Sequence, residues 1–181
     1  MPRRQSLPLL WLLSDARNDA RLEAALARLP RGSGFVFRHY HLDTATRESR
    51  FAALAGTARA HGHLAVLSGT CEDAHRLGAD GAYGSIARLG RSHALPRFAT
   101  AHHGDELQRA IASDADGIFL SPVFPTRSHP GATTLGVHGF HVLAQQSPVP
   151  VIALGGMTAA RAKELAWPRW GAIDGLAQDS A

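Results

Sequence analysis

Short apolar runs alternate with longer mixed runs along the 181 residues of this chain, and glycine or proline often separates them. The apolar runs carry almost no charge, as expected of strands that are covered on both faces. We interpret eight runs as strands: Leu9–Leu13, Phe35–Tyr40, Leu64–Leu67, Gly81–Gly84, Phe98–His102, Gly117–Val123, Val149–Leu154 and Ile173–Ala177. This alternation predicts a parallel sheet with crossover helices.

The segments between the runs carry apolar residues at helical spacing. Helices are predicted over 18–29, 43–60, 70–77, 105–112 and 159–166, with a weaker one around 86–94. Eight strands and about seven helices favour a small α/β protein, a (β/α)8 TIM barrel whose eighth helix is truncated or absent. The length suits a single domain over residues 1–181. An open doubly wound sheet stays as the alternative, without dinucleotide binding because no Gly-x-Gly-x-x-Gly turn follows the first strand.

Composition excludes several classes of function. The single cysteine, Cys71, rules out a disulfide framework and fits a reducing cytoplasm. The net charge of +4 comes almost entirely from arginine, and no basic cluster or aromatic platform predicts nucleic-acid binding. The apolar stretch Leu7–Leu13 is too short to span a membrane and lacks a cleavage site, so we expect a cytoplasmic protein. A second copy covering the barrel's bottom or side, a homodimer, is an open expectation.

Three places at predicted strand ends carry residues suited to an anion. Arg38 lies within an otherwise apolar strand, where a charge needs a partner or a ligand. The sixth strand breaks into a loop whose Thr126, Ser128 and the positive residues Arg127 and His129 suit phosphate oxygens.

The third place follows the seventh strand. Gly155 and Gly156 let the backbone approach a ligand, and the helix after them begins with free N–H groups. The 11 histidines show no metal-ligand spacing, so no metal site is predicted. His102, at the end of the fifth strand, is a candidate for proton transfer.

Two motifs, Ser121–Thr126 continuing to His129 and Pro150–Met157, resemble the thiamine phosphate synthase/TenI family. The rest of the chain is similar in order: Leu9–Asp15 and Phe37–Arg38 to the first two strands, Thr100–His102 to the Ser-x-His that ends the fifth, and Gly171–Ala177 to the eighth. The resemblance implies a barrel of thiamine biosynthesis that joins hydroxymethylpyrimidine diphosphate to a thiazole phosphate.

The resemblance also implies roles for individual residues. Arg38, Thr126 and Ser128 would hold the leaving diphosphate, and Gly156, with backbone after the eighth strand, would hold the thiazole phosphate. His129 and Gly155 complete the expected phosphate-binding set. Thr100 and His102 would join Arg38 as catalytic residues. The expected partner is therefore a small phosphorylated heterocycle.

The departures from the family pattern concern the metal. The family's third strand ends in Asn-Asp, with the acid a magnesium ligand, where this chain has Ser68-Gly69. A second acid is missing from the segment Gly84–Arg88, and Tyr40 and His129 stand in place of two lysines. Because magnesium prefers carboxylates, we expect no protein-bound cofactor, and magnesium only through the substrate diphosphate.

Three activities stay open at this point. Thiamine phosphate synthase is the family's commonest chemistry. A thiazole tautomerase needs only proton transfer, but the histidine of that subgroup is Pro122 here, so His102 or His129 would substitute. A non-catalytic phosphate-ligand-binding or regulatory barrel would also fit the reduced set of polar residues.

Overall fold

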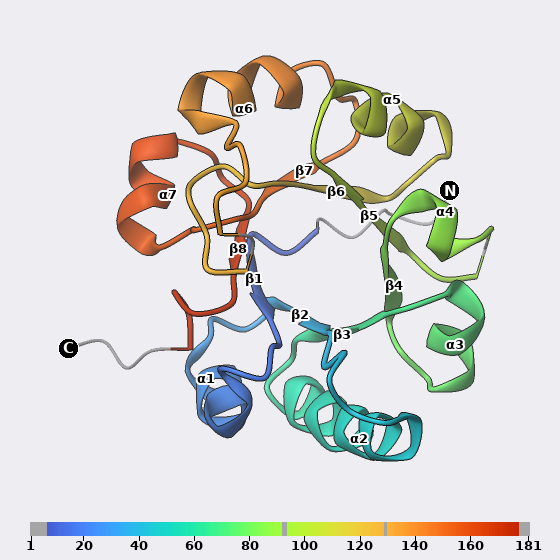
Figure 1. The fold of residues 1–181 in the computed structure, drawn as a ribbon. Helices are drawn as coiled ribbons and strands as arrows, with labels where there is room; N and C mark the ends of the chain where they lie inside the picture. Colours follow the sequence, from blue (N-terminus) through green and yellow to red (C-terminus); the bar gives the residue numbers. More distant parts are fainter. Residues whose placement is uncertain (1–6, 92–93, 129, 178–181) are drawn as a thin grey trace.

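The computed structural model describes residues 7–91, 94–128 and 130–177, and in it the strands form a closed parallel barrel in chain order (Figure 1). The strands are β1 Leu10–Leu13, β2 Gly34–Phe37, β3 Leu64–Ser68, β4 Gly81–Gly84, β5 Arg97–Ala101, β6 Gly117–Leu120, β7 Val151–Ala153 and β8 Trp170–Ala172. β8 pairs with both β7 and β1, which closes the barrel and confirms the (β/α)8 fold.

Helices surround the barrel on the outside (Figure 1). They are α1 Leu22–Arg28 with a preceding short η1 Asp19–Arg21, α2 Thr44–Ala60, α3 Cys71–Arg76, α4 Ile86–Leu89, α5 Gly104–Ala112, α6 Gly136–Ala144 and α7 Ala159–Leu165. Asp43, Thr70 and Thr158 cap α2, α3 and α7 by accepting a hydrogen bond from a backbone N–H three residues later. In the described residues after β8, 173–177, no helix forms.

The strands divide their side chains between two cores with a period of two. One face of each strand packs under the helices, as Phe35, Phe37 and Leu120 do. The other face fills the barrel interior with Trp11, Leu13, Val36, Val66, Tyr83, Phe98, Phe119, Ile152 and Leu154. Side chains that continue this inner face beyond the strand ends therefore enter the barrel mouth.

Large and small residues alternate at the bottom of the interior. Trp11 on β1 lies between Gly34 of β2 and Gly171 of β8, and its ring packs edge-on against Phe98 at 5.0 Å and Phe119 at 5.3 Å between centroids. A Cβ on Gly34 would lie 2.1 Å from the indole. The glycines thus make the space that the aromatic rings occupy.

Several elements differ from the sequence predictions, among them two strands and two helices. β2 ends at Phe37 rather than Tyr40, because His39 turns the chain with φ 36°. The predicted eighth strand, Ile173–Ala177, is wrong: β8 is the preceding segment, and 173–177 form a turn whose Gly175 lies against the carbonyl of Met157.

The other two differences concern helices. α4 ends after one turn because Gly90 adopts φ 71°. α6 was not predicted, since glycines at 136 and 139 and the histidines around them conceal its apolar face. Within the described ranges, no helix combines the length and the apolar character that crossing a membrane requires.

Two glycine substitutions test the interior packing. Gly34→Ala should lower the free energy of unfolding by about 1–3 kcal/mol, because the added methyl collides with Trp11. Gly56→Ala is the matched control on the exposed face of α2, where a Cβ meets nothing within 4 Å, and it should raise stability by about 0.5–1 kcal/mol. Urea unfolding of both variants measures the difference, and equal effects would contradict this packing.

Candidate functional site

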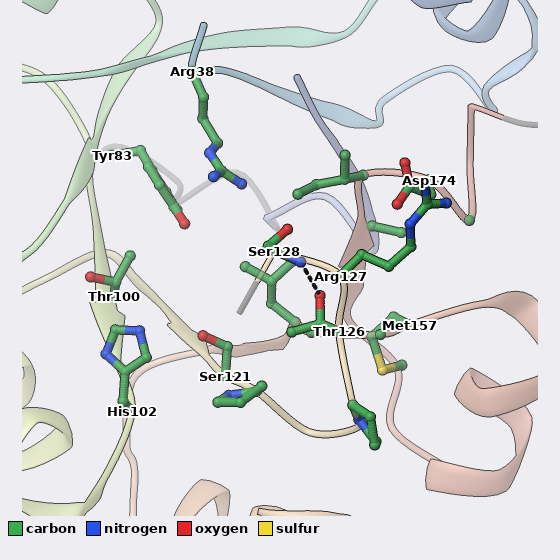
Figure 2. A pocket seen from close by; sticks show the side chains of 18 of the residues that line it. Arg38, Tyr83, Thr100, His102, Ser121, Thr126, Arg127, Ser128, Met157 and Asp174 are labelled. Atoms are coloured by element: carbon green, nitrogen blue, oxygen red, sulfur yellow. Dashed lines mark hydrogen bonds between the residues drawn. The ribbon is translucent and has the colours of Figure 1, made fainter. Parts of the chain in front are cut away.

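A pocket of about 590 Å³ opens at the carboxyl ends of the strands (Figure 2). Seven predicted site residues line it together: Arg38, Thr100, His102, Thr126, Ser128, Gly155 and Gly156. They come from the ends of β2 and β5 and from the loops after β6 and β7. His129, the eighth predicted residue, lies outside the described residues.

The described lining is strongly cationic. Five arginines line the pocket, from separate loops and helices: Arg17, Arg38, Arg88, Arg127 and Arg161. Asp174 is the one acid in this described lining, and its carboxylate lies 3.7 Å from Nη2 of Arg17. Converging guanidinium groups favour a multiply charged anion, whose oxygens can accept several forked hydrogen bonds.

Arg38 continues the inner face of β2, as the strand pattern predicts. Its guanidinium lies 5.3 Å from the ring centroid of Tyr40, and no ion pair within the described chain neutralises it. Its Nε is buried without a hydrogen-bond partner in the described structure. Tyr83 lies beside Arg38 (Figure 2), and burial raises the pKa of its phenol, which keeps the hydroxyl protonated as a potential donor.

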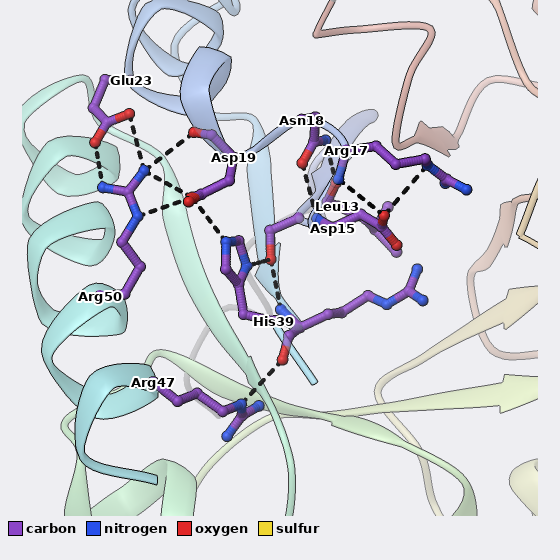
Figure 3. Close-up of polar contacts among 11 residues, drawn as sticks. Leu13, Asp15, Arg17, Asn18, Asp19, Glu23, His39, Arg47 and Arg50 are labelled. Carbon is purple, nitrogen blue, oxygen red and sulfur yellow. Dashed lines mark hydrogen bonds and ion pairs between the residues drawn. The ribbon is translucent and has the colours of Figure 1, made fainter. Parts of the chain in front are cut away.

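A hydrogen-bonded line of side chains supports the backbone of Arg38 (Figure 3). The N–H of Arg38 donates to Oγ of Ser14 at 2.7 Å, and Ser14 Oγ is 2.7 Å from Nδ1 of His39. His39 Nε2 lies 2.8 Å from Oδ1 of Asp19, which also accepts a hydrogen bond from Arg50. Because the Asp19 carboxylate can only accept, the imidazole donates from Nε2, and Nδ1 of the neutral ring accepts the proton of Ser14 Oγ.

Ser14, His39 and Asp19 have the order of a catalytic triad but not its exposure. Ser14 is fully buried and does not line the pocket, so its oxygen cannot attack a substrate there. His39 is also buried, and its ring stacks on Phe37 at 4.6 Å between centroids. The group therefore holds the turn after β2 and fixes where the side chain of Arg38 begins.

A hydrogen bond connects the loop after β6 to Arg17, in the segment that follows β1. Arg17 donates from Nη2 to Oγ of Ser128 at 3.0 Å, and the N–H of Ser128 lies 3.3 Å from Oγ1 of Thr126. Nε of Arg17 is 3.3 Å from Asp15. Thr126 and Ser128 thus present their hydroxyls beside a guanidinium, a suitable environment for phosphate oxygens.

The two glycines after β7 allow the loops after β6 and β7 to pack closely against each other. Gly155 and Gly156 have φ 96° and 62°, and a Cβ would lie 2.6 Å from Cα of Pro122 or 2.4 Å from the carbonyl oxygen of Pro125, respectively. The N–H of Phe124 donates to the carbonyl of Gly155 at 3.1 Å. The glycines therefore bring the loops after β6 and β7 into direct contact at the pocket wall.

His102 and Glu106 form a polar pair at the pocket edge. Glu106 Oε2 lies 2.9 Å from Nδ1 of His102 and also accepts its backbone N–H at 2.7 Å. Burial raises the pKa of Glu106, but the hydrogen bonds and charge of His102 outweigh it and lower the pKa overall. With Nδ1 donating to this carboxylate, Nε2 of His102 is left with a lone pair that can accept a proton.

The residues near the pocket do not fit a resident magnesium ion. No group of three His, Cys, Asp or Glu residues in the described parts of the chain could hold a metal. Gly69, and Ala87 in the segment that lacks the second acid of the family pattern, have no ligating atoms in their side chains. Asp73 lies closest to the first of these positions, but its carboxylate is bonded to Thr70 at 2.9 Å and to Arg76 at 3.3 Å.

Several lining residues were absent from the sequence prediction. Arg17, Tyr83, Arg88 and Arg161 face the pocket beside the predicted residues. Tyr83 could have been predicted from the sequence, because it shares the inner face of its strand with Gly81. The other three lie in turns or helices, whose direction no strand periodicity specifies.

The fold and this mouth define a small TIM barrel suited to anionic ligands, and comparisons with known proteins agree. A family model described as thiamine monophosphate synthase matches residues 10–177. The thiamine-phosphate synthase of Chromobacterium violaceum is 33% identical over 160 residues, which cover 82% of this chain and 76% of that protein. The structure of thiamine phosphate pyrophosphorylase from Pyrococcus furiosus superposes with a TM-score of 0.78 at 19% identity, covering 94% of this chain and 90% of that one.

The chain belongs to the thiamine monophosphate synthase family, as its motifs predicted. The thiamine-phosphate synthase of Thermosynechococcus vestitus is 29% identical over 166 residues, or 86% of this chain. The match spans only 46% of that relative, so this chain covers about half its length.

The His39 network predicts a pH dependence of stability. Burial lowers the pKa of His39 despite the opposing hydrogen bond and charge of Asp19. The unfolded chain therefore binds this proton more readily, so the stabilisation is complete above about pH 6.5 and is lost as the pH falls through the lowered pKa. The free energy of unfolding should fall between pH 7 and pH 5, and it should fall less in His39→Asn.

Asparagine suits this test because it tolerates the left-handed backbone of residue 39. His138→Asn, at an exposed position of α6, is the control and should keep the parent's pH dependence. Urea unfolding at several pH values gives the slopes. A slope in His39→Asn that equals the parent's would mean that His39 is not the group responsible.

Proposed function

We propose that this chain is a thiamine phosphate synthase, joining hydroxymethylpyrimidine diphosphate to a thiazole phosphate in the pocket at the barrel mouth. The observation that carries the proposal is the charge of the described lining, five arginines against one acid. Both substrates bear phosphate groups, and the leaving diphosphate is the most negative species in the reaction. The proposal also rests on the chain's membership of the family.

In this reaction the C–O bond between the pyrimidine methylene and the diphosphate breaks, and the electron pair leaves with the diphosphate. The thiazole nitrogen then donates its lone pair to the methylene carbon and forms the C–N bond. No oxidant or reductant is required. Groups that bind the diphosphate more strongly as its charge develops lower the barrier.

We assign the diphosphate to Arg38, Thr126 and Ser128, and the thiazole phosphate to the Gly155–Gly156 wall. Arg38 has an unpartnered buried nitrogen, and the two hydroxyls lie beside Arg17. Arg161 lies beside the glycine wall, where its Nη1 donates to the carbonyl of Gly156 at 2.5 Å. Thr100 and His102 lie on the side of β5, where the pyrimidine ring would be held.

Incubation of the purified chain with both substrates, followed by chromatography, tests the proposal. The parent should form thiamine phosphate, and Arg38→Ala should lower kcat/KM by about 100-fold because it removes a charged donor to the leaving group. Arg109→Ala is the control, since Arg109 is exposed on α5 and does not line the pocket. Equal losses in the two variants would contradict the assignment of Arg38.

Calorimetry with thiazole phosphate and thiamine phosphate separates the other activities. Binding without turnover would favour a binding or regulatory barrel. Interconversion of thiazole tautomers that His102→Gln abolishes would favour a tautomerase, since His102 offers the proton acceptor that such a reaction needs. A parent that neither binds nor converts these compounds would refute the whole proposal.

A further inference from the structure

The side of the pocket formed after β2 and β4 carries two arginines, Arg38 and Arg88. Arg38 and Arg88 place their guanidinium carbons 5.3 Å and 5.9 Å from the centroid of the same ring, that of Tyr40. We name these three residues the Arg38–Tyr40–Arg88 cluster. Neither arginine forms an ion pair with any described residue.

The cluster is held in place by contacts beneath it. The hydroxyl of Tyr40 is 2.7 Å from Oγ of Ser68, at the end of β3. Arg47 donates from Nη2 to the carbonyl of Ser68 at 2.6 Å and from Nε to the carbonyl of Arg38 at 3.0 Å. The two free guanidinium groups thus rest on a ring whose position is fixed by hydrogen bonds, and cation–π attraction favours that arrangement.

Like charges are close together in this region. Burial lowers the pKa of Arg47, and the charge of Arg88 adds to the lowering, while the charges of Asp73 and Glu48 oppose it. The buried Nε of Arg38 has no hydrogen-bond partner in the described structure. Repulsion between cations and an unsatisfied buried donor both cost free energy, and an anion in the pocket would relieve both.

The same side of the pocket is where this chain lacks the two magnesium-binding acids of the family pattern. Gly69 follows β3, and Ala87 directly precedes Arg88. A Cβ on Gly84 would lie 3.9 Å from Cδ of Arg88, so the stem of this arginine lies along the loop that begins at the end of β4. The positive charge on this side of the pocket comes from arginine side chains, Arg38 and Arg88.

We propose that the Arg38–Tyr40–Arg88 cluster is a metal-free site for a diphosphate group, with two guanidinium groups taking the place of a divalent cation. The proposal rests on the proposed function for the identity of the organic substrate, but binding of inorganic diphosphate tests it independently. Each guanidinium can donate a pair of hydrogen bonds to phosphoryl oxygens. Arg88 thereby becomes a binding residue for the leaving group.

Titration calorimetry with inorganic diphosphate, in the presence of EDTA, is the decisive experiment. The parent chain should bind without metal. Arg88→Ala should raise Kd by at least about 10-fold, because charge-assisted hydrogen bonds are lost. Arg88→Lys should recover only part of the affinity, since lysine keeps the charge but lacks the planar fork.

Arg109→Ala serves again as the matched control and should bind like the parent. Arg88 is exposed and its side chain forms no hydrogen bond to another described residue, so its replacement should leave the fold intact, as unfolding measurements can verify. Diphosphate binding that appears only after magnesium is added would overturn the proposal. An unchanged Kd in Arg88→Ala would overturn it as well.

Failure of this site and failure of the proposed function give different results. Metal-free diphosphate binding in a chain that makes no thiamine phosphate supports the site and refutes the synthase. A synthase whose turnover stops in EDTA, with no diphosphate bound under the same conditions, refutes the site and leaves the synthase standing.

Discussion

The contact of Trp11 with the glycines of the two neighbouring strands sets the geometry of this barrel. One large ring faces Gly34 and Gly171 across the interior, and Phe98 and Phe119 pack against its edges. This layer fixes which residue of each strand points inward. Since the side-chain period is two, it also decides which residues reach the mouth two or four positions later.

The positions of several site residues follow from this period of two. Arg38 stands two residues after inward-facing Val36, and Thr100 stands two residues after Phe98. Both line the pocket, as does Ser121 after Phe119. The charge of the mouth is thus supplied by residues after a strand end, in loops and in helices, while the interior beneath it stays apolar. Low polarisability below the pocket strengthens the field that the arginines exert on a bound anion.

Sequence reasoning recovered the barrel and the predicted part of the pocket because both depend on periodic patterns. Arg38 was indicated by a period of two and Thr126 and the glycine pair by breaks at strand ends, whereas Thr100 was indicated by the family resemblance. The eighth strand was misplaced because Ile173 and Leu176 look apolar enough to form one, whereas Trp170–Ala172 is marked only by its pairing with β1 and β7.

Other features depended on contacts between residues far apart in the chain. Arg17 reaches Ser128 across the pocket, and Ser14 meets His39 only because a left-handed turn follows β2. No spacing within a single segment predicts such pairs. The absence of the magnesium-binding acids, in contrast, was evident from the sequence. The role of Arg88, which follows one of these positions, became clear only from its contact with the ring of Tyr40.

The close approach of Gly155 and Gly156 to the loop after β6 has a consequence for engineering this barrel. Backbone atoms of the two loops touch, and the N–H groups of Val123 and Phe124 donate to the carbonyls of Leu154 and Gly155. The two loops therefore pack together as one structural unit, and neither can be exchanged alone. A transplant from another barrel has to carry both segments, with their glycines and prolines, as a single module.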